Sequence, residues 1–123
     1  MITIHGRIIS KKRQYKRKKG GGLYLSQRWK NFEERVVYED LQGAHKHKSN
    51  AKLCIEYRFK VKGKYNVDID NMIVSVNDLL QTARVIKDDK LITEGSFKKT
   101  GGHKKWKTEI RIFELIDHSL IYE

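Results

Sequence analysis

One stretch near the middle of the chain alternates strictly between apolar residues and residues of other kinds. It runs from Lys52 to Lys60, and its apolar members are Leu53, Ile55, Tyr57 and Phe59. Successive side chains of a β-strand point to opposite faces, so every second residue shares one face. The pattern therefore predicts a strand that is buried on one face only.

Two other segments have the periodicity of helices. From residue 27 to residue 42 apolar side chains recur near helical spacing, with Ser26 as a typical N-cap before them and Gly43 as a stop signal after them. The second segment carries apolar residues at positions i, i+1, i+4, i+7, i+8 and i+11, namely Met72, Ile73, Val76, Leu79, Leu80 and Ala83. This spacing makes one helical stripe, with Asp70 or Asn71 as its expected N-cap.

Four further segments are predicted to be strands. They cover residues 2–9, 23–25, 91–97 and 105–116, and the basic segment KKTGGHKK before the last of them is predicted to be a hairpin loop because of its Gly-Gly. Apart from the short strand at 23–25, the order is β, α, β, α, β, β. We therefore expect a single α+β domain over residues 1–123, with a mixed or antiparallel sheet packed against two main helices.

The charge balance narrows the class of partner. The chain has 27 Lys and Arg against 15 Asp and Glu, a formal net charge of +12, and such a field favours polyanions, nucleic acid first. No apolar run is long enough to span a bilayer, and the N-terminal residues lack the apolar core of a signal peptide. The single cysteine, Cys54, excludes an internal disulfide framework and fits a reducing compartment. We expect a cytoplasmic protein with no membrane partner.

Basic residues cluster in two segments that are candidates for binding DNA. Seven of the nine residues 11–19 are basic and three glycines follow, which predicts a flexible basic loop over residues 10–22 that contacts phosphates. The segment KKTGGHKK is a second candidate for phosphate contacts. The proposed DNA-binding residues are Lys11, Lys12, Arg13, Lys16, Arg17, Lys18, Lys19, Lys87, Lys98, Lys99, Lys104 and Lys105.

Two acidic pairs stand out against this basic background. Asp68 and Asp70 lie two positions apart, so in an extended segment their carboxylates point the same way, although a helix cap and a loop residue would explain them as well. Asp88 and Asp89 follow the second helix, and a turn can bring them beside the first pair. Carboxylates in one place repel each other unless a cation joins them. Mg²⁺ accepts such ligands together with phosphate oxygens, and beside a phosphodiester it can activate a water.

At this point the chain resembles the RusA-like Holliday junction resolvases. The resemblance rests on the sequence DIDN at residues 68–71, the amphipathic helix, the pair Asp88–Asp89, and Lys98–Lys99 downstream. The opening strand with a glycine, followed by a basic segment, is also similar to that family. The similarity extends over nearly the whole chain.

The resemblance implies a homodimeric, Mg²⁺-dependent endodeoxyribonuclease, with Mn²⁺ as an alternative ion, that nicks four-way DNA junctions symmetrically in recombination and repair. It implies that Asp68, Asp70 and Asp89 are the catalytic, metal-binding aspartates and that Asp88 adjoins them as a further metal ligand. Lys99 matches a family lysine after the second acidic pair. A phage or prophage origin, or the cytoplasm of a prokaryotic or phage-infected cell, also fits this family.

One position departs from the family pattern. Val74 stands four residues after Asp70, where the family usually has a lysine that aids catalysis or DNA binding. Lys87, Lys90 or Lys99 are the candidates to supply this charge. The rival hypothesis is a non-catalytic basic nucleic-acid-binding protein, which would explain the net charge equally well.

Overall fold

A four-stranded mixed sheet forms the base of the molecule in the computed structural model, which describes residues 1–115. Its strands are β1 (Ile2–His5), β4 (Leu53–Lys62), β5 (Ile92–His103) and β6 (Lys107–Glu114), in the order β1-β6-β4-β5. The pairs β1–β6 and β6–β4 are antiparallel, whereas β4 and β5 are parallel. The predicted α+β class with a mixed sheet is confirmed.

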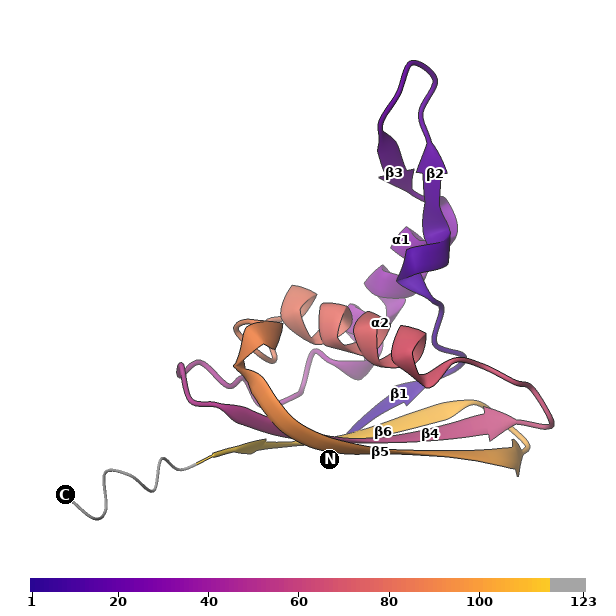
Figure 1. Ribbon diagram of the computed structural model, residues 1–123. Coiled ribbons are helices and arrows are strands. Elements are labelled where there is room, and N and C mark those ends of the chain that lie inside the picture. Colours follow the sequence, from indigo (N-terminus) through magenta and orange to yellow (C-terminus); the bar gives the residue numbers. More distant parts are fainter. Residues whose placement is uncertain (116–123) are drawn as a thin grey trace, which may run out of the picture.

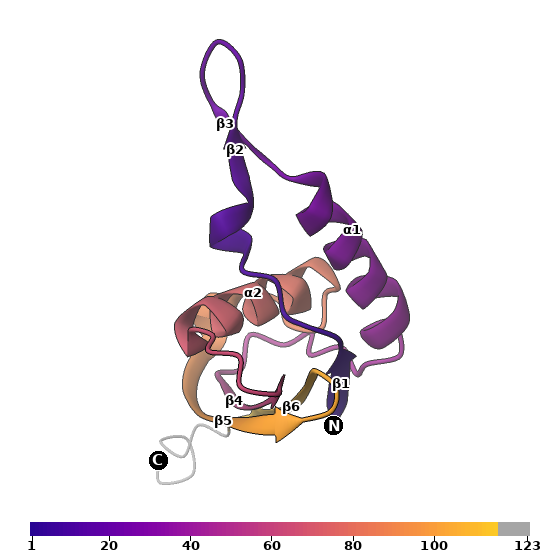
Figure 2. The same cartoon turned by 90° about the vertical axis from the view of Figure 1, so that its right-hand side faces the viewer.

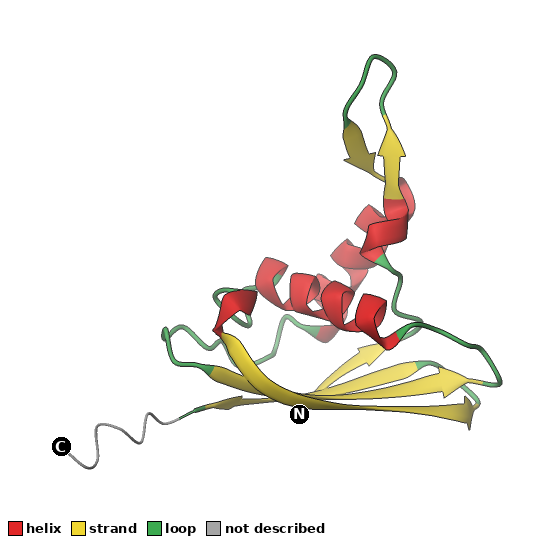
Figure 3. Ribbon diagram, viewed as in Figure 1, coloured by secondary structure: helices red, strands yellow, loops and turns green. Residues whose placement is uncertain are grey.

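Both main helices lie on the same face of this sheet (Figure 3). They are α1 (Gln27–Arg35), which continues as the π-helical turn η2 (Val36–Asp40), and α2 (Ile69–Thr82). The alternation in β4 was predicted correctly, because its members Leu53, Ile55, Tyr57 and Phe59 are all buried. They face the apolar stripes of the helices, whose buried members include Trp29, Phe32, Val36, Met72, Val76, Leu79 and Leu80.

The first helix begins as predicted and ends differently. Ser26 is its N-cap, since the hydroxyl oxygen accepts a hydrogen bond of 3.2 Å from the Trp29 N–H. The α-helix stops at Arg35, and the chain then widens into a π-turn in which the Leu41 N–H donates to the Val36 carbonyl. Val36 and Leu41 are both fully buried although they are five residues apart. The wide turn is what places both on the core side.

The second helix begins earlier than predicted. Its first bond runs from the Met72 N–H to the Asp68 carbonyl, so Asp68 is the N-cap and the expectation of Asp70 or Asn71 was wrong. The Asp68 side chain nevertheless makes no capping hydrogen bond. Asp70 lies in the first turn of the helix. The carboxylate of Asp68 is therefore left free of the backbone N–H groups that a capping aspartate normally accepts from.

The segment predicted as a hairpin loop is strand instead. Residues 98–103 belong to β5, and β4 lies between β5 and β6, so these two strands do not pair. Gly101 and Gly102 fall where the register between β4 and β5 shifts. Two glycines permit a bulge as readily as a turn, which explains the error. The last strand ends at Glu114, and residue 116 of the predicted strand lies outside the described residues.

The basic segment near the N-terminus has more structure than the predicted loop. The first strand ends at His5 rather than Ile9, because Gly6 turns the chain with φ of 85°. A 3-10 turn, η1 (Lys11–Gln14), then leads into a hairpin of β2 (Tyr15–Arg17) and β3 (Leu23–Leu25). This hairpin projects away from the sheet and helices (Figures 1 and 2). The short strand predicted at residues 23–25 is confirmed as β3.

Candidate active site

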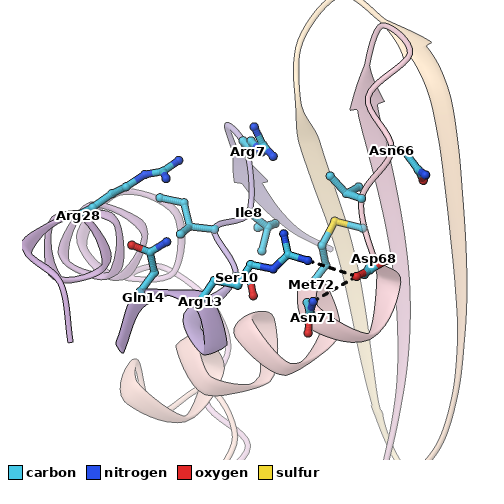
Figure 4. A pocket seen from close by; sticks show the side chains of 12 residues that line it. Arg7, Ile8, Ser10, Arg13, Gln14, Arg28, Asn66, Asp68, Asn71 and Met72 are labelled. Carbon is cyan, nitrogen blue, oxygen red and sulfur yellow. Dashed lines mark hydrogen bonds and ion pairs between the residues drawn. The ribbon is translucent and has the colours of Figure 1, made fainter. Parts of the chain in front are cut away.

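The first acidic pair lies where the chain enters α2. The Asp68 carboxylate is exposed, accepts a hydrogen bond of 3.4 Å from the Asn71 side-chain amide and lies 3.7 Å from Nη2 of Arg13 (Figure 4). Asp70 is also exposed, in the first turn of the helix. The positive end of the helix dipole favours carboxylates at this place. Both carboxylates are therefore open to solvent.

The second acidic pair lies at the start of the 3-10 turn η3 (Asp89–Leu91). The Lys90 N–H donates to Asp88 Oδ1 at 2.9 Å and lowers the pKa of the Asp88 carboxyl. The Asp89 N–H donates to Oε1 of Gln81, in the last turn of α2, at 3.2 Å. Asp89 is also close enough to Tyr57 for its charge to help burial raise the pKa of that tyrosine to about 12. Asp89 thus lies beside the C-terminal end of α2.

The two acidic pairs are at opposite ends of α2 (Figure 1). The helix has 14 residues, and a helix of that length spans roughly 20 Å. Within residues 1–115 no three His, Cys, Asp or Glu side chains are grouped so that they could hold a metal ion. The convergence expected within one chain is therefore absent. The physical reason is that β5 starts at the C-terminal end of α2 and runs parallel to β4, so its far end returns to Asp68 instead.

A lysine at that far end does reach the first acidic pair. Nζ of Lys99 donates a hydrogen bond of 2.9 Å to the backbone carbonyl of Val67, the residue before Asp68. Lys87, by contrast, donates to Oδ1 of Asn50. Val74 is 58% exposed on α2. Of the three candidates for the missing lysine charge, Lys99 is the one whose contact adjoins Asp68.

The predicted DNA-binding residues fall into three groups. Lys12, Arg13, Lys16, Arg17, Lys18 and Lys19 are exposed along η1 and the hairpin, and Lys98, Lys99, Lys104 and Lys105 are exposed on β5 and the turn after it. Lys87 is exposed beyond the C-terminal end of α2. Lys11 differs, because its Nζ lies 2.6 Å from Oδ2 of Asp78 and its N–H donates to Oγ of Ser75. These bonds fasten the base of the hairpin to α2.

A pocket of about 240 Å³ lies beside Asp68, and no feature of the sequence predicts it. It is lined by Arg7 and Arg28 in addition to Arg13 (Figure 4). Each of the two new arginines is isolated in its own segment, without a charge run or motif around it. Only the folded chain brings them together, so no local signal in the sequence marks them.

Among the described residues, none of the helices is long and apolar enough to cross a membrane.

Comparison with known proteins places the chain in a family. The family model described as Endodeoxyribonuclease RusA matches residues 5–113. The crossover junction endodeoxyribonuclease RusA of Aquifex aeolicus (strain VF5) is 30% identical over 86 residues, which are 70% of this chain and 68% of that relative. The family match includes both acidic pairs, the basic hairpin and Lys99. Because the match extends over most of the chain, this protein belongs to the RusA endodeoxyribonuclease family.

Proposed function

We propose that the protein is a metal-dependent endonuclease that resolves four-way DNA junctions by symmetric hydrolysis of phosphodiesters, in recombination and repair. The family match supports the endonuclease class, and the name of the Aquifex relative supports the junction as substrate. The observation that carries the proposal is the exposed pair Asp68 and Asp70 among cations, in a chain of net charge +12. Cations attract the DNA backbone, while the carboxylates are suited to a metal rather than to DNA.

The residues at the start of α2 fit a hard divalent cation. Asp68 and Asp70 offer carboxylate oxygens, and Asp68 is not used as a helix cap. Mg²⁺, or Mn²⁺ in its place, takes a few carboxylates together with waters and phosphate oxygens. When bound, the ion would polarise the phosphodiester and lower the pKa of an attacking water. Lys99, beside Val67, would hold positive charge near the strand that is cut.

A homodimer would complete the acidic site. In a two-fold dimer whose α2 helices run antiparallel, Asp88 and Asp89 of one subunit lie beside Asp68 and Asp70 of the other. An open groove between α2 and β5, where Phe97 is 59% exposed, is a suitable contact surface for this arrangement. Two equivalent sites related by a two-fold axis match a junction that is cut symmetrically on two strands.

The direct test is cleavage of a fixed-sequence four-way junction with Mg²⁺, by wild type and by Asp70→Asn. We expect the variant to lose cleavage, because it lacks one of the proposed metal ligands. It should bind the junction at least as well as wild type, because a negative charge is removed from a DNA-facing surface. Glu34→Gln removes an exposed carboxylate on α1 and serves as the matched control. Equal cleavage by Asp70→Asn and wild type would overturn the site. Tight binding without cleavage by wild type would instead favour the non-catalytic rival.

A further inference from the structure

The pocket beside Asp68 gathers three arginines around a single carboxylate. Its walls come from the link between β1 and η1, from η1 itself, from the starts of α1 and α2, and from the loop between β4 and α2 (Figure 4). Arg7, Arg13 and Arg28 line it against one carboxylate, that of Asp68. Three guanidinium groups against one carboxylate leave the pocket with an excess of positive charge, which favours an anionic ligand such as a phosphate group.

The other pocket residues resemble the surroundings of a nucleotide more than those of a bare ion. Ile8 and Met72 are buried apolar residues of the lining, and Gln14, Asn66 and Asn71 add side-chain amides. A volume of about 240 Å³ exceeds what a lone phosphate group fills. Guanidinium groups bind phosphate with paired N–H donors, while amides suit the edges of a base or sugar.

An aromatic cluster stands at the rim of the same pocket. The guanidinium of Arg7 lies 5.6 Å from the ring centre of Tyr65 and 5.2 Å from that of Trp106. The two rings are themselves 5.5 Å apart. Tyr65 precedes the pocket residue Asn66 and is 57% exposed, so ring surface is open to a further partner. Exposed aromatic rings beside cations are how proteins stack bases that are not paired.

We propose that this pocket and Tyr65 together bind one nucleotide at the branch point of the DNA, where the interrupted stacking allows a base pair to open. Its phosphate lies against Arg13 and Arg28, and its base stacks on the Tyr65 ring. The nucleotide is then held next to Asp68, which directs the branch point to the site of cleavage. Selection of branched over plain duplex DNA comes from this contact, because a paired base cannot leave its stack without cost. This inference rests on the proposed function for the identity of the ligand as DNA.

The test compares binding of a short matched duplex with binding of the same duplex carrying one unpaired nucleotide. Affinities are measured by fluorescence anisotropy in EDTA, so that no cleavage is involved. Wild type is expected to prefer the second DNA by about tenfold, the scale of one stacked base. Tyr65→Leu, which keeps apolar bulk and removes the aromatic face, and Arg28→Gln should each bring this preference close to one.

Arg111→Gln is the matched control for charge. Arg111 is exposed on β6, on the face of the sheet opposite α2, and does not line the pocket. The Arg111→Gln substitution should weaken binding of both DNAs by the same factor and leave the preference for the DNA with the unpaired nucleotide unchanged. If Arg28→Gln and Tyr65→Leu, shown to be folded by circular dichroism, behave like Arg111→Gln, the inference is overturned. Junction cleavage by a wild type without the preference would sink this inference alone, whereas preference without cleavage would sink only the proposed nuclease activity.

Discussion

Nζ of Lys99 and the backbone carbonyl of Val67 are joined by a hydrogen bond of 2.9 Å, although they lie 32 positions apart in the chain. The bond ties the edge strand β5 to the loop that leads into α2. It exists because β5 runs parallel to β4 and so returns to the end of the sheet where that loop begins. A lysine that follows the second acidic pair in sequence is thereby brought to the first pair.

Removing this charge should slow cleavage more than it weakens binding. Lys99→Gln keeps a hydrogen-bond donor and loses the ammonium group, and we expect single-turnover cleavage of a junction to fall about 10- to 100-fold. Lys98→Gln is the control. The Lys98 side chain is also exposed, but it points to the face of β5 opposite to that of Lys99. Similar losses of rate in the two variants would show that Lys99 contributes only to the overall positive charge of the protein and has no specific role at the site.

A lysine at residue 74 should replace the function of Lys99. Position 74 lies one helical turn after Asp70, on the same side of α2, and the Val74 side chain is 58% exposed. We therefore expect Val74→Lys to restore most of the cleavage rate lost in Lys99→Gln. Val74→Gln in the same background adds length without charge and should restore nothing. Rescue by both substitutions would mean that side-chain length, and not charge, is what position 74 contributes.

Complementation tests whether two subunits share each acidic site. Neither Asp70→Asn nor Asp89→Asn alone should cleave, but a heterodimer of the two retains one intact site if the site is composite. Random mixing should then recover about a quarter of the wild-type sites, and each heterodimer should nick one strand only. Supercoiled plasmid extruding a cruciform separates nicking from double cutting. If both single variants are inactive and their mixture is equally inactive, both acidic pairs act within one subunit and the composite site is overturned.

The ion pair between Lys11 and Asp78 should stabilise the fold rather than bind DNA. Both side chains are less than a third exposed, at 20% and 29%, and their charged atoms are 2.6 Å apart. Lys11→Met should lower the free energy of unfolding by about 1 kcal/mol in urea titrations. Lys12→Met, at the exposed neighbouring position, should change it by less than about 0.5 kcal/mol. A double-mutant cycle with Asp78→Asn isolates the coupling, and additive effects would mean that the pair contributes nothing.

Tyr57 should make stability depend on pH in the alkaline range. Burial, aided by the charge of Asp89, raises its pKa from 10.0 to about 12, against the lowering effect of the Asn77 hydrogen bond. Between these values the unfolded chain loses the tyrosine proton and the folded chain keeps it, so stability falls as pH rises. The loss for this group is about 2 kcal/mol, and Tyr57→Phe should remove it from the pH profile measured by chemical denaturation. Parallel profiles for the two proteins would contradict the raised pKa.

The local pattern of the sequence was enough to predict the elements that form the core. The alternation through β4 and the stripe through α2 identify buried faces, because burial imposes the period of a strand or a helix directly on the residues. Which other strand a given strand pairs with is not recorded in any comparable periodic pattern of the sequence. Gly101 and Gly102 fit a hairpin turn and a bulge equally, and only the pairing of β5 with β4 decided between them.

The sequence by itself also determined the chemistry of the candidate site: two acidic pairs, one helix apart, in a strongly basic chain. Their positions in space were decided by the tertiary structure, which places them at opposite ends of α2 and brings Lys99 to the first pair. The pocket formed with Arg7 and Arg28 is likewise a product of folding. The reason is that spacing along a chain defines neighbours within one element, whereas residues of different elements meet only through packing and strand order.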